Sequence, residues 1–174
     1  MAESSVGSER MDDGLEIFQC AERVILYRRQ KKEIEQRMEE IVEADYPNLL
    51  TISGVGAVTV GGIIGEIGNV ENCHGSDSIV AMAGLNPKVY ESGKEKMGHT
   101  RISKIGSPYL RNALFTAAKC MYMHKVKVIH DFVGKKLAEG KKMTCALDHA
   151  ARKFANIFYT LAKTKQDFVE HSST

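Results

Sequence analysis

The chain has 174 residues, 43% hydrophobic and 26% charged, which fits one globular domain with an appendage. No apolar run approaches the ~20 residues of a membrane span, and the four cysteines lack CxxC spacing, so we expect no membrane contact, no disulfide framework and a cytoplasmic setting. Residues 88–142 hold 13 Lys and Arg against 4 Asp and Glu, a local net charge of +9, whereas the rest of the chain carries −7. This basic half predicts an anion-binding face, with a phosphate-rich partner as the first candidate.

The N-terminal part predicts a disordered lead-in over residues 1–11 and a long helix over residues 12–45. This second stretch has no Gly or Pro after Gly14, and Lys31 interrupts a regular apolar pattern. Seven residues recur at alternating spacings of three and four: Ile17, Cys20, Val24, Tyr27, Ile34, Met38 and Ile41. The pattern predicts a coiled-coil-like arm that pairs with a second copy, and an amphipathic helix packed on its own domain is the alternative.

A glycine-rich hairpin is predicted over residues 46–68. An apolar turn precedes Gly54-Val55-Gly56, and a second apolar helix follows, which is the pattern of a helix-hairpin-helix. The two glycines allow a tight turn whose backbone N–H groups lie at a helix N-terminus and can bind one phosphate without reading sequence. Gly54 and Gly56 are therefore candidate DNA-binding residues, and a buried hairpin that touches no ligand is the alternative.

Residues 84–107 predict a long loop between a short helix ending near Ala83, which Ser76 or Asp77 can cap, and a helix that starts after Ser107. With the first turn of that helix, the loop supplies five candidate DNA-binding cations: Lys88, Lys94, Arg101, Lys104 and Arg111. Ser92 is the candidate nucleophile, because cations can stabilise the charge that develops when a base takes its proton. The residues alone leave two alternatives open, which are Tyr90 as the nucleophile and Ser92 as an ordinary turn serine.

Residues 108–163 predict a helical bundle, with helices over residues 109–123, 126–139 and 144–163 and a flexible tail over residues 166–174. The last helix carries an apolar stripe that is typical of core: Leu147, Ala151, Phe154, Ile157, Phe158 and Leu161. No stretch alternates polar and apolar residues as a strand does. The predicted fold class is all-α.

Two Cys/His pairs, Cys120/His124 and Cys145/His149, each have the i, i+4 spacing of one helix face and could together hold zinc. Zinc motifs usually use shorter Cys spacings, so we favour coincidence and predict no metal site. Acidic residues are scarce around the basic face, which argues against a two-metal carboxylate site built from this chain alone.

Several motifs in order resemble one known family. They are the hairpin at residues 49–68, AGLNP at 83–87, Ser92-Gly93, and GHTRISKIGSPYLRNAL at 98–114. Together they resemble the C-terminal domain of a group of bacterial and archaeal insertion-sequence transposases that includes the Piv-type DNA invertases. The resemblance implies that DNA is the partner and that Ser92 forms a covalent phosphoserine link to it. Some members are directed by a structured non-coding RNA, which is a further implied partner.

Members of that family also carry an N-terminal RuvC-like domain with a DEDD metal site, which this sequence does not show. We therefore expect Mg²⁺ only with that domain, no cofactor in this chain, and DNA binding without cutting. The predicted function is the serine-bearing, DNA-binding C-terminal domain of a transposase or site-specific recombinase. The alternatives are a non-enzymatic helix-hairpin-helix module that clamps the duplex backbone, and a helical oligomerisation domain without nucleic acid.

Overall fold

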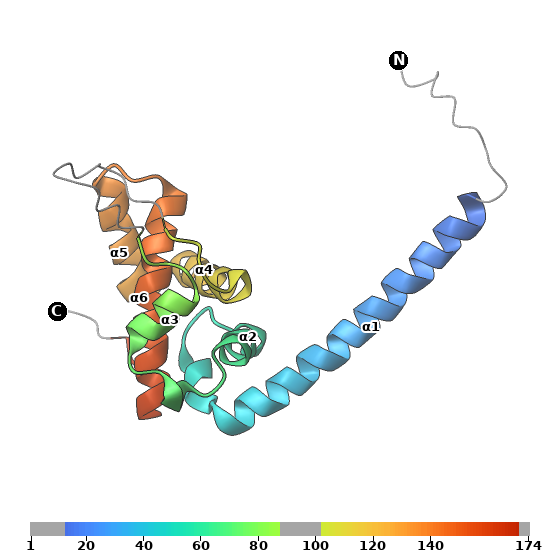
Figure 1. Cartoon of the computed structure of the whole chain (residues 1–174), viewed down its shortest axis with the longest axis horizontal. Coiled ribbons are helices and arrows are strands. Elements are labelled where there is room, and N and C mark those ends of the chain that lie inside the picture. The colour runs from blue at the N-terminus through green and yellow to red at the C-terminus, as the bar shows by residue number, and fades with distance from the viewer. Residues whose placement is uncertain (1–12, 88–101, 171–174) are drawn as a thin grey trace, which may run out of the picture. The chain divides into compact units, whose positions relative to one another are not determined.

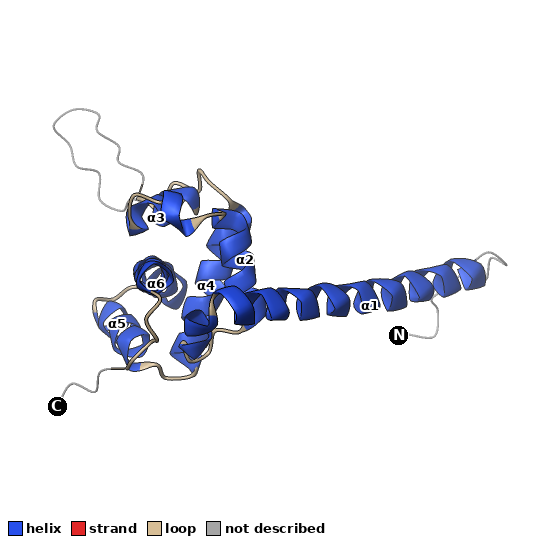
Figure 2. Cartoon of the chain, turned by 90° about the horizontal axis from the view of Figure 1, so that it is seen from below, coloured by secondary structure: helices blue, strands red, loops and turns tan. Residues whose placement is uncertain are grey.

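The computed structural model describes residues 13–87 and 102–170 (Figure 1). Within these ranges every regular element is helical, and the one β-type pairing is an isolated antiparallel bridge between Pro87 and Ile102 (Figure 2). The prediction of an all-α fold is confirmed. None of the described helices is long and apolar enough to cross a membrane. The chain divides into two compact units, Met1–Arg37 and Met38–Thr174.

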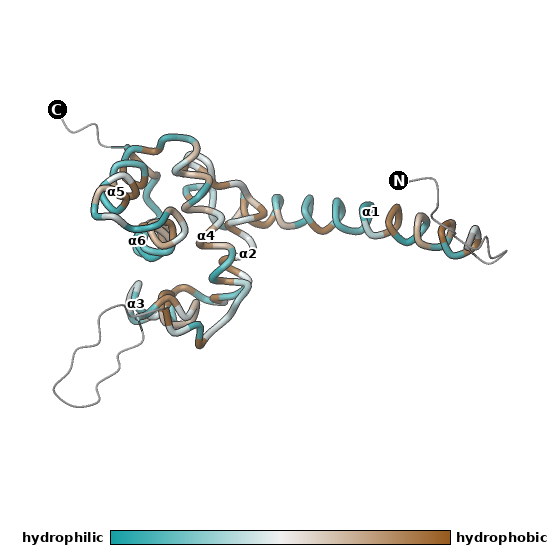
Figure 3. The backbone as a smooth tube through the Cα atoms, turned by 90° about the horizontal axis from the view of Figure 1, so that it is seen from above, coloured by the Kyte–Doolittle hydropathy of each residue, from teal (hydrophilic) through white to brown (hydrophobic). Residues whose placement is uncertain are grey.

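The predicted N-terminal arm is one continuous helix, α1 (Asp13–Asp45). Its surface carries ion pairs at i, i+4 spacing, Arg29 with Glu33 at 3.8 Å and Lys31 with Glu35 at 3.4 Å. Figure 3 shows apolar positions recurring between polar ones along this helix. Most of the described seam residues are exposed, with Ile34 61% exposed, whereas Met38 is half-buried.

The second unit contains the end of α1, two short 3₁₀ helices and five α-helices in its described part. These are η1 (Pro47–Thr51), α2 (Ala57–Ile67), η2 (Val70–Asn72), α3 (Ser76–Met82), α4 (Pro108–Met123), α5 (Lys127–Ala138) and α6 (Met143–Thr164). Helix α6 contacts α3, α4 and α5, and Figure 2 views it nearly end-on among them. Its predicted stripe lies in the core, where Phe154 and Phe158 are fully buried and meet edge to face.

Local signals explain where some of these helices begin. Helix α4 starts at Pro108, and the Ser107 hydroxyl accepts a hydrogen bond from the Leu110 N–H at 3.1 Å. The predicted cap of α3 is wrong: Gly75 precedes this helix, and no side chain caps it. The short helix η2 was not predicted, although the Asn69 side chain caps it by accepting from the Glu71 N–H.

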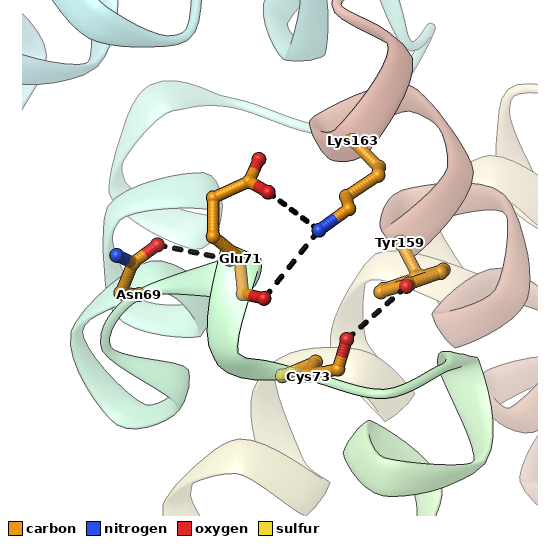
Figure 4. Close-up of polar contacts among 5 residues, drawn as sticks. All are labelled: Asn69, Glu71, Cys73, Tyr159 and Lys163. Carbon is orange, nitrogen blue, oxygen red and sulfur yellow. Dashed lines mark hydrogen bonds and ion pairs between the residues drawn. The ribbon is translucent and has the colours of Figure 1, made fainter.

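The C-terminal end of α6 is fixed by polar contacts to earlier parts of the chain (Figure 4). Lys163 pairs with the Glu71 carboxylate, and the Tyr159 hydroxyl donates to the Cys73 carbonyl at 3.2 Å. The Asn48 amide donates to the Leu161 carbonyl at 2.9 Å and to the Gln166 carbonyl at 3.0 Å, which ties η1 to the end of α6. These contacts hold α6 in place while its N-terminal end reaches the basic residues described next.

Candidate nucleic-acid interface

The described residues on either side of segment 88–101 are joined by backbone pairing. Pro87 and Ile102 form an antiparallel bridge, and three backbone hydrogen bonds connect the two sides: Ser103 N–H to Asn86 O (2.7 Å), Lys104 N–H to Gly84 O (3.0 Å) and Ser107 N–H to Met82 O (2.7 Å). We call residues 82–87 and 102–107 the loop base. The chain therefore leaves and rejoins the helical core at one place.

Two glycines make the loop base possible. Gly84 and Gly106 both have positive φ, at 64° and 147°. A Cβ on Gly106 would lie 2.2 Å from the Met82 carbonyl oxygen, and a Cβ on Gly84 would lie 2.8 Å from that of Ile105. Only glycine permits both the backbone angles and the close approach, so the fold requires glycine at these positions of the motifs AGLNP and IGSP.

Arg111, a predicted DNA-binding residue, makes a hydrogen bond within the fold. It lies in the first turn of α4, is half-buried, and its guanidinium donates to the Ala83 carbonyl at 2.9 Å. This bond satisfies a carbonyl at the end of α3 and ties α4 to the loop base. Lys104, by contrast, is exposed on the loop base in a left-handed backbone conformation with φ 56°.

A cleft of about 860 Å³, which we call the basic cleft, lies between the loop base and the N-terminal end of α6. Four cations line it from both sides: Lys104, Lys141, Lys142 and Arg152. Its other lining residues are Leu85, Pro87, Ile102, Cys145, Asp148 and His149. The arrangement brings four positive charges against one carboxylate, which is suited to binding an anion.

Partial burial shifts the pKa values of two side chains in the basic cleft, Asp148 and His149. Burial raises the pKa of Asp148, although the nearby positive groups His149, Lys104 and Arg111 act in the opposite direction. Burial also lowers the pKa of His149, and neighbouring lysines and Arg152 lower it further. The positive charge of the cleft at neutral pH therefore comes from its Lys and Arg side chains.

Three of the four cleft cations, Lys141, Lys142 and Arg152, were not among the predicted site residues. The sequence did carry a usable signal, because Cys145, His149 and Arg152 follow one another at spacings of four and three on α6. Lys141 and Lys142 directly precede this helix. Their convergence with Lys104 depends on the loop base, which no local pattern predicts.

The other predicted site residues fall into two groups. Lys88, Ser92, Lys94 and Arg101, together with the rival nucleophile Tyr90, lie outside the described residues. Gly54 and Gly56 lie between η1 and α2, so the first arm of the predicted helix-hairpin-helix is a five-residue 3₁₀ helix.

The two hairpin glycines differ in their surroundings. Gly54 has φ 84°, and a Cβ there would lie 3.0 Å from the His124 ring and 3.2 Å from the Cys120 carbonyl group, at the end of α4. Its lack of a side chain therefore serves packing between the hairpin and α4. Gly56 is exposed and directly precedes α2.

Among residues 13–87 and 102–170 there is no group of three or more His, Cys, Asp or Glu side chains able to hold a metal ion. The pairs Cys120/His124 and Cys145/His149 lie on α4 and α6 and do not combine into a four-ligand site within these ranges. The Mg²⁺ that the family resemblance implies also has no carboxylate cluster to receive it among these residues.

Comparisons with known proteins agree with the motifs. The model of the transposase IS116/IS110/IS902 family matches residues 46–134, just over half of the chain. The pilin gene-inverting proteins of Moraxella bovis and Moraxella lacunata are each 26% identical over 120 residues. The matched stretch covers 69% of this chain and 37% of each relative, so the chain spans little more than a third of their length. The family match includes the hairpin, the loop base and α4.

Proposed function

Since the chain belongs to the IS116/IS110/IS902 transposase family, we propose that it is the DNA-binding, serine-bearing part of a transposase or site-specific DNA recombinase. The observation that supports DNA binding is the basic cleft, where Lys104 from the loop base meets Lys141, Lys142 and Arg152 around α6. Lys and Arg side chains neutralise DNA phosphates and supply most of the affinity of such proteins. Lys88, Lys94 and Arg101 are proposed to extend this surface.

Ser92 is the proposed nucleophile. It follows Pro87 closely in the sequence, and Pro87 lies on the edge of the basic cleft. In the proposed step the serine oxygen bonds to the phosphorus of a DNA phosphodiester, and the bond from phosphorus to one deoxyribose oxygen breaks. The serine proton passes to a base, and the departing deoxyribose oxygen takes up a proton. The cations of the cleft stabilise the charge that builds up on the phosphate.

DNA binding is tested by replacing Lys141, Lys142 and Arg152 together with Gln and measuring duplex affinity over a range of salt concentrations. We expect weaker binding to every duplex sequence and a salt slope smaller by ~0.9 for each phosphate that is no longer neutralised. Lys163→Gln is a control for removal of a cation, because Lys163 pairs with Glu71 at the other end of α6, ~30 Å from Lys142 and ~16 Å from Arg152 along the helix. Equal affinity in the triple variant and the control would place the DNA surface elsewhere.

The nucleophile is tested in a full-length relative, at the position that matches Ser92. Ser92→Ala should abolish the covalent protein–DNA adduct and leave DNA binding intact, because the change removes one hydroxyl. Tyr90→Phe should leave the adduct unchanged. An adduct that survives the serine change and disappears with the tyrosine change would transfer the role to Tyr90.

A second candidate function is a helix-hairpin-helix module that clamps the DNA backbone without chemistry. Gly56 favours it, because this residue is exposed at the N-terminus of α2, where backbone N–H groups lack helical acceptors. Gly56 is accordingly proposed as a secondary phosphate contact, and Gly54 is proposed to shape the turn that presents it. A second copy of the chain is proposed as the partner of α1, and a guide-type RNA as a partner by family analogy.

A further inference from the structure

We infer that the basic cleft receives one unpaired nucleotide of a DNA strand, with its phosphate on the lysines and Arg152 and its base inside the cleft. The inference rests on the proposed DNA-binding function and names the kind of DNA that this site recognises. It is carried by three features: the volume of the cleft, its apolar side chains, and a carboxylate among the cations.

The volume of the cleft separates a nucleotide site from a site for duplex backbone. DNA-binding proteins commonly contact the phosphates of a duplex through cations on an open surface. The basic cleft has a volume of about 860 Å³, within the ~300–1,000 Å³ of pockets that bury a small organic ligand. A double helix is too wide to enter such a space, whereas a single nucleotide fits.

The lining of the cleft matches the two halves of a nucleotide. Pro87, Ile102 and Cys145 present apolar surface, and Leu85 is fully buried beneath it. An unstacked base gains from apolar contact when it leaves water, as bases do in pockets that receive flipped nucleotides. The lysine and arginine heads supply the charge that holds the phosphate attached to that base.

Asp148 is the feature that a phosphate-only site does not explain. Its carboxylate lines the same cleft and repels phosphate, and partial burial makes its charged form costly. Within residues 13–87 and 102–170, Asp148 makes no ion pair within 4.0 Å and no side-chain hydrogen bond. A carboxylate can accept hydrogen bonds from the ring N–H and amino groups of a base. On the pairing edge those donors are free only when the base is unpaired.

The test compares a DNA hairpin, the same hairpin with one bulged nucleotide, and the bulged hairpin made of RNA, by fluorescence anisotropy at fixed salt. We expect the bulged DNA to bind about tenfold more tightly than the paired DNA, since stacking or burying one base contributes this much in single-strand binders. Cys145→Phe fills the cleft without changing its charge, so it should remove the preference. Thr144→Phe is the matched control, because Thr144 is exposed on the same turn of α6 and does not line the cleft.

Asp148→Asn adds a second measurement. If the cleft only attracted phosphate, this change would strengthen binding of paired and bulged DNA equally. Loss of the negative charge should strengthen binding of paired DNA, while the changed acceptor should reduce the preference for the bulge. Equal affinity of the wild type for bulged and paired DNA would overturn the inference and leave the proposed DNA binding standing. A preference that persists in Cys145→Phe, or stronger capture of the RNA hairpin, would also overturn it. No binding to any of the DNAs would instead reject the proposed function itself.

Discussion

The guanidinium of Arg111 donates a hydrogen bond to the carbonyl oxygen of Ala83, at 2.9 Å and across 28 positions of sequence. Ala83 ends α3, and Arg111 lies in the first turn of α4. One side chain thus joins the two helices that flank the loop base. Arg111 is the charged residue of the motif SPYLR, and its guanidinium stabilises the position of α4 against the end of α3.

Arg111→Met should therefore lower stability more than it changes binding. The variant leaves the Ala83 carbonyl without its charged donor, and we expect a loss of about 1–2 kcal/mol in the free energy of unfolding, since the site is half-exposed. Urea denaturation measures the loss, and anisotropy on the folded fraction measures DNA affinity. A variant of unchanged stability with tenfold weaker binding would make Arg111 a direct DNA contact.

Gly106→Ala should disrupt the loop base. The new Cβ would lie 2.2 Å from the Met82 carbonyl oxygen, so the backbone must move, and a loss above about 3 kcal/mol or failure to fold is expected. Gly65→Ala in α2 is the matched control, because a Cβ there meets nothing within 4 Å. Removing a helical glycine should stabilise the protein by about 0.5–1 kcal/mol. Equal thermal midpoints for the two variants would contradict the close approach.

Asp148→Asn should stabilise the protein at neutral pH. The folded-state pKa of Asp148 is raised by burial, so the neutral acid is favoured in the folded chain. The contribution of this group to stability is present below its unfolded pKa, about 4, and is lost as the pH rises through the higher folded value. The difference between variant and wild type in urea midpoint should therefore be positive at pH 7 and vanish near pH 3. A variant less stable than wild type at pH 7 would show that the carboxylate is needed by the fold.

Charges placed on the exposed apolar seam of α1 should prevent pairing of two copies. Val24→Glu combined with Ile34→Glu should convert a dimer to a monomer in sedimentation, because each buried apolar side chain contributes ~1.5–3 kcal/mol. Ile25→Glu is the control: Ile25 is 68% exposed and lies outside the heptad positions. Met38 is left unchanged, since its end lies 2.8 Å from the position a Cβ would take on Gly61 of α2. A wild-type chain that sediments as a monomer would remove the basis for the proposed pairing.

Features with a local cause were predictable from the sequence. Ser107-Pro108 marks the start of α4, and the 3.6-residue spacing of Leu147, Phe154 and Phe158 marks the buried face of α6. Only Lys104 of the cleft cations was predicted, because its neighbours in space, Lys141, Lys142 and Arg152, lie 37 to 48 positions later in the sequence. The hydrogen bond from Arg111 to Ala83 was not predicted, since its acceptor is a backbone carbonyl that any sequence would offer.

The loop base also bears on how members of this family could diverge. Its backbone hydrogen bonds, and the one that the Ser103 hydroxyl donates to the Gly84 carbonyl, lie within residues 82–87 and 102–107, so they do not depend on the side chains of the segment between them. Lengthening a closed loop costs only about 0.6 kcal/mol for each doubling. A change in the length or sequence of the segment between Pro87 and Ile102 should therefore leave the pairing of the loop base in place.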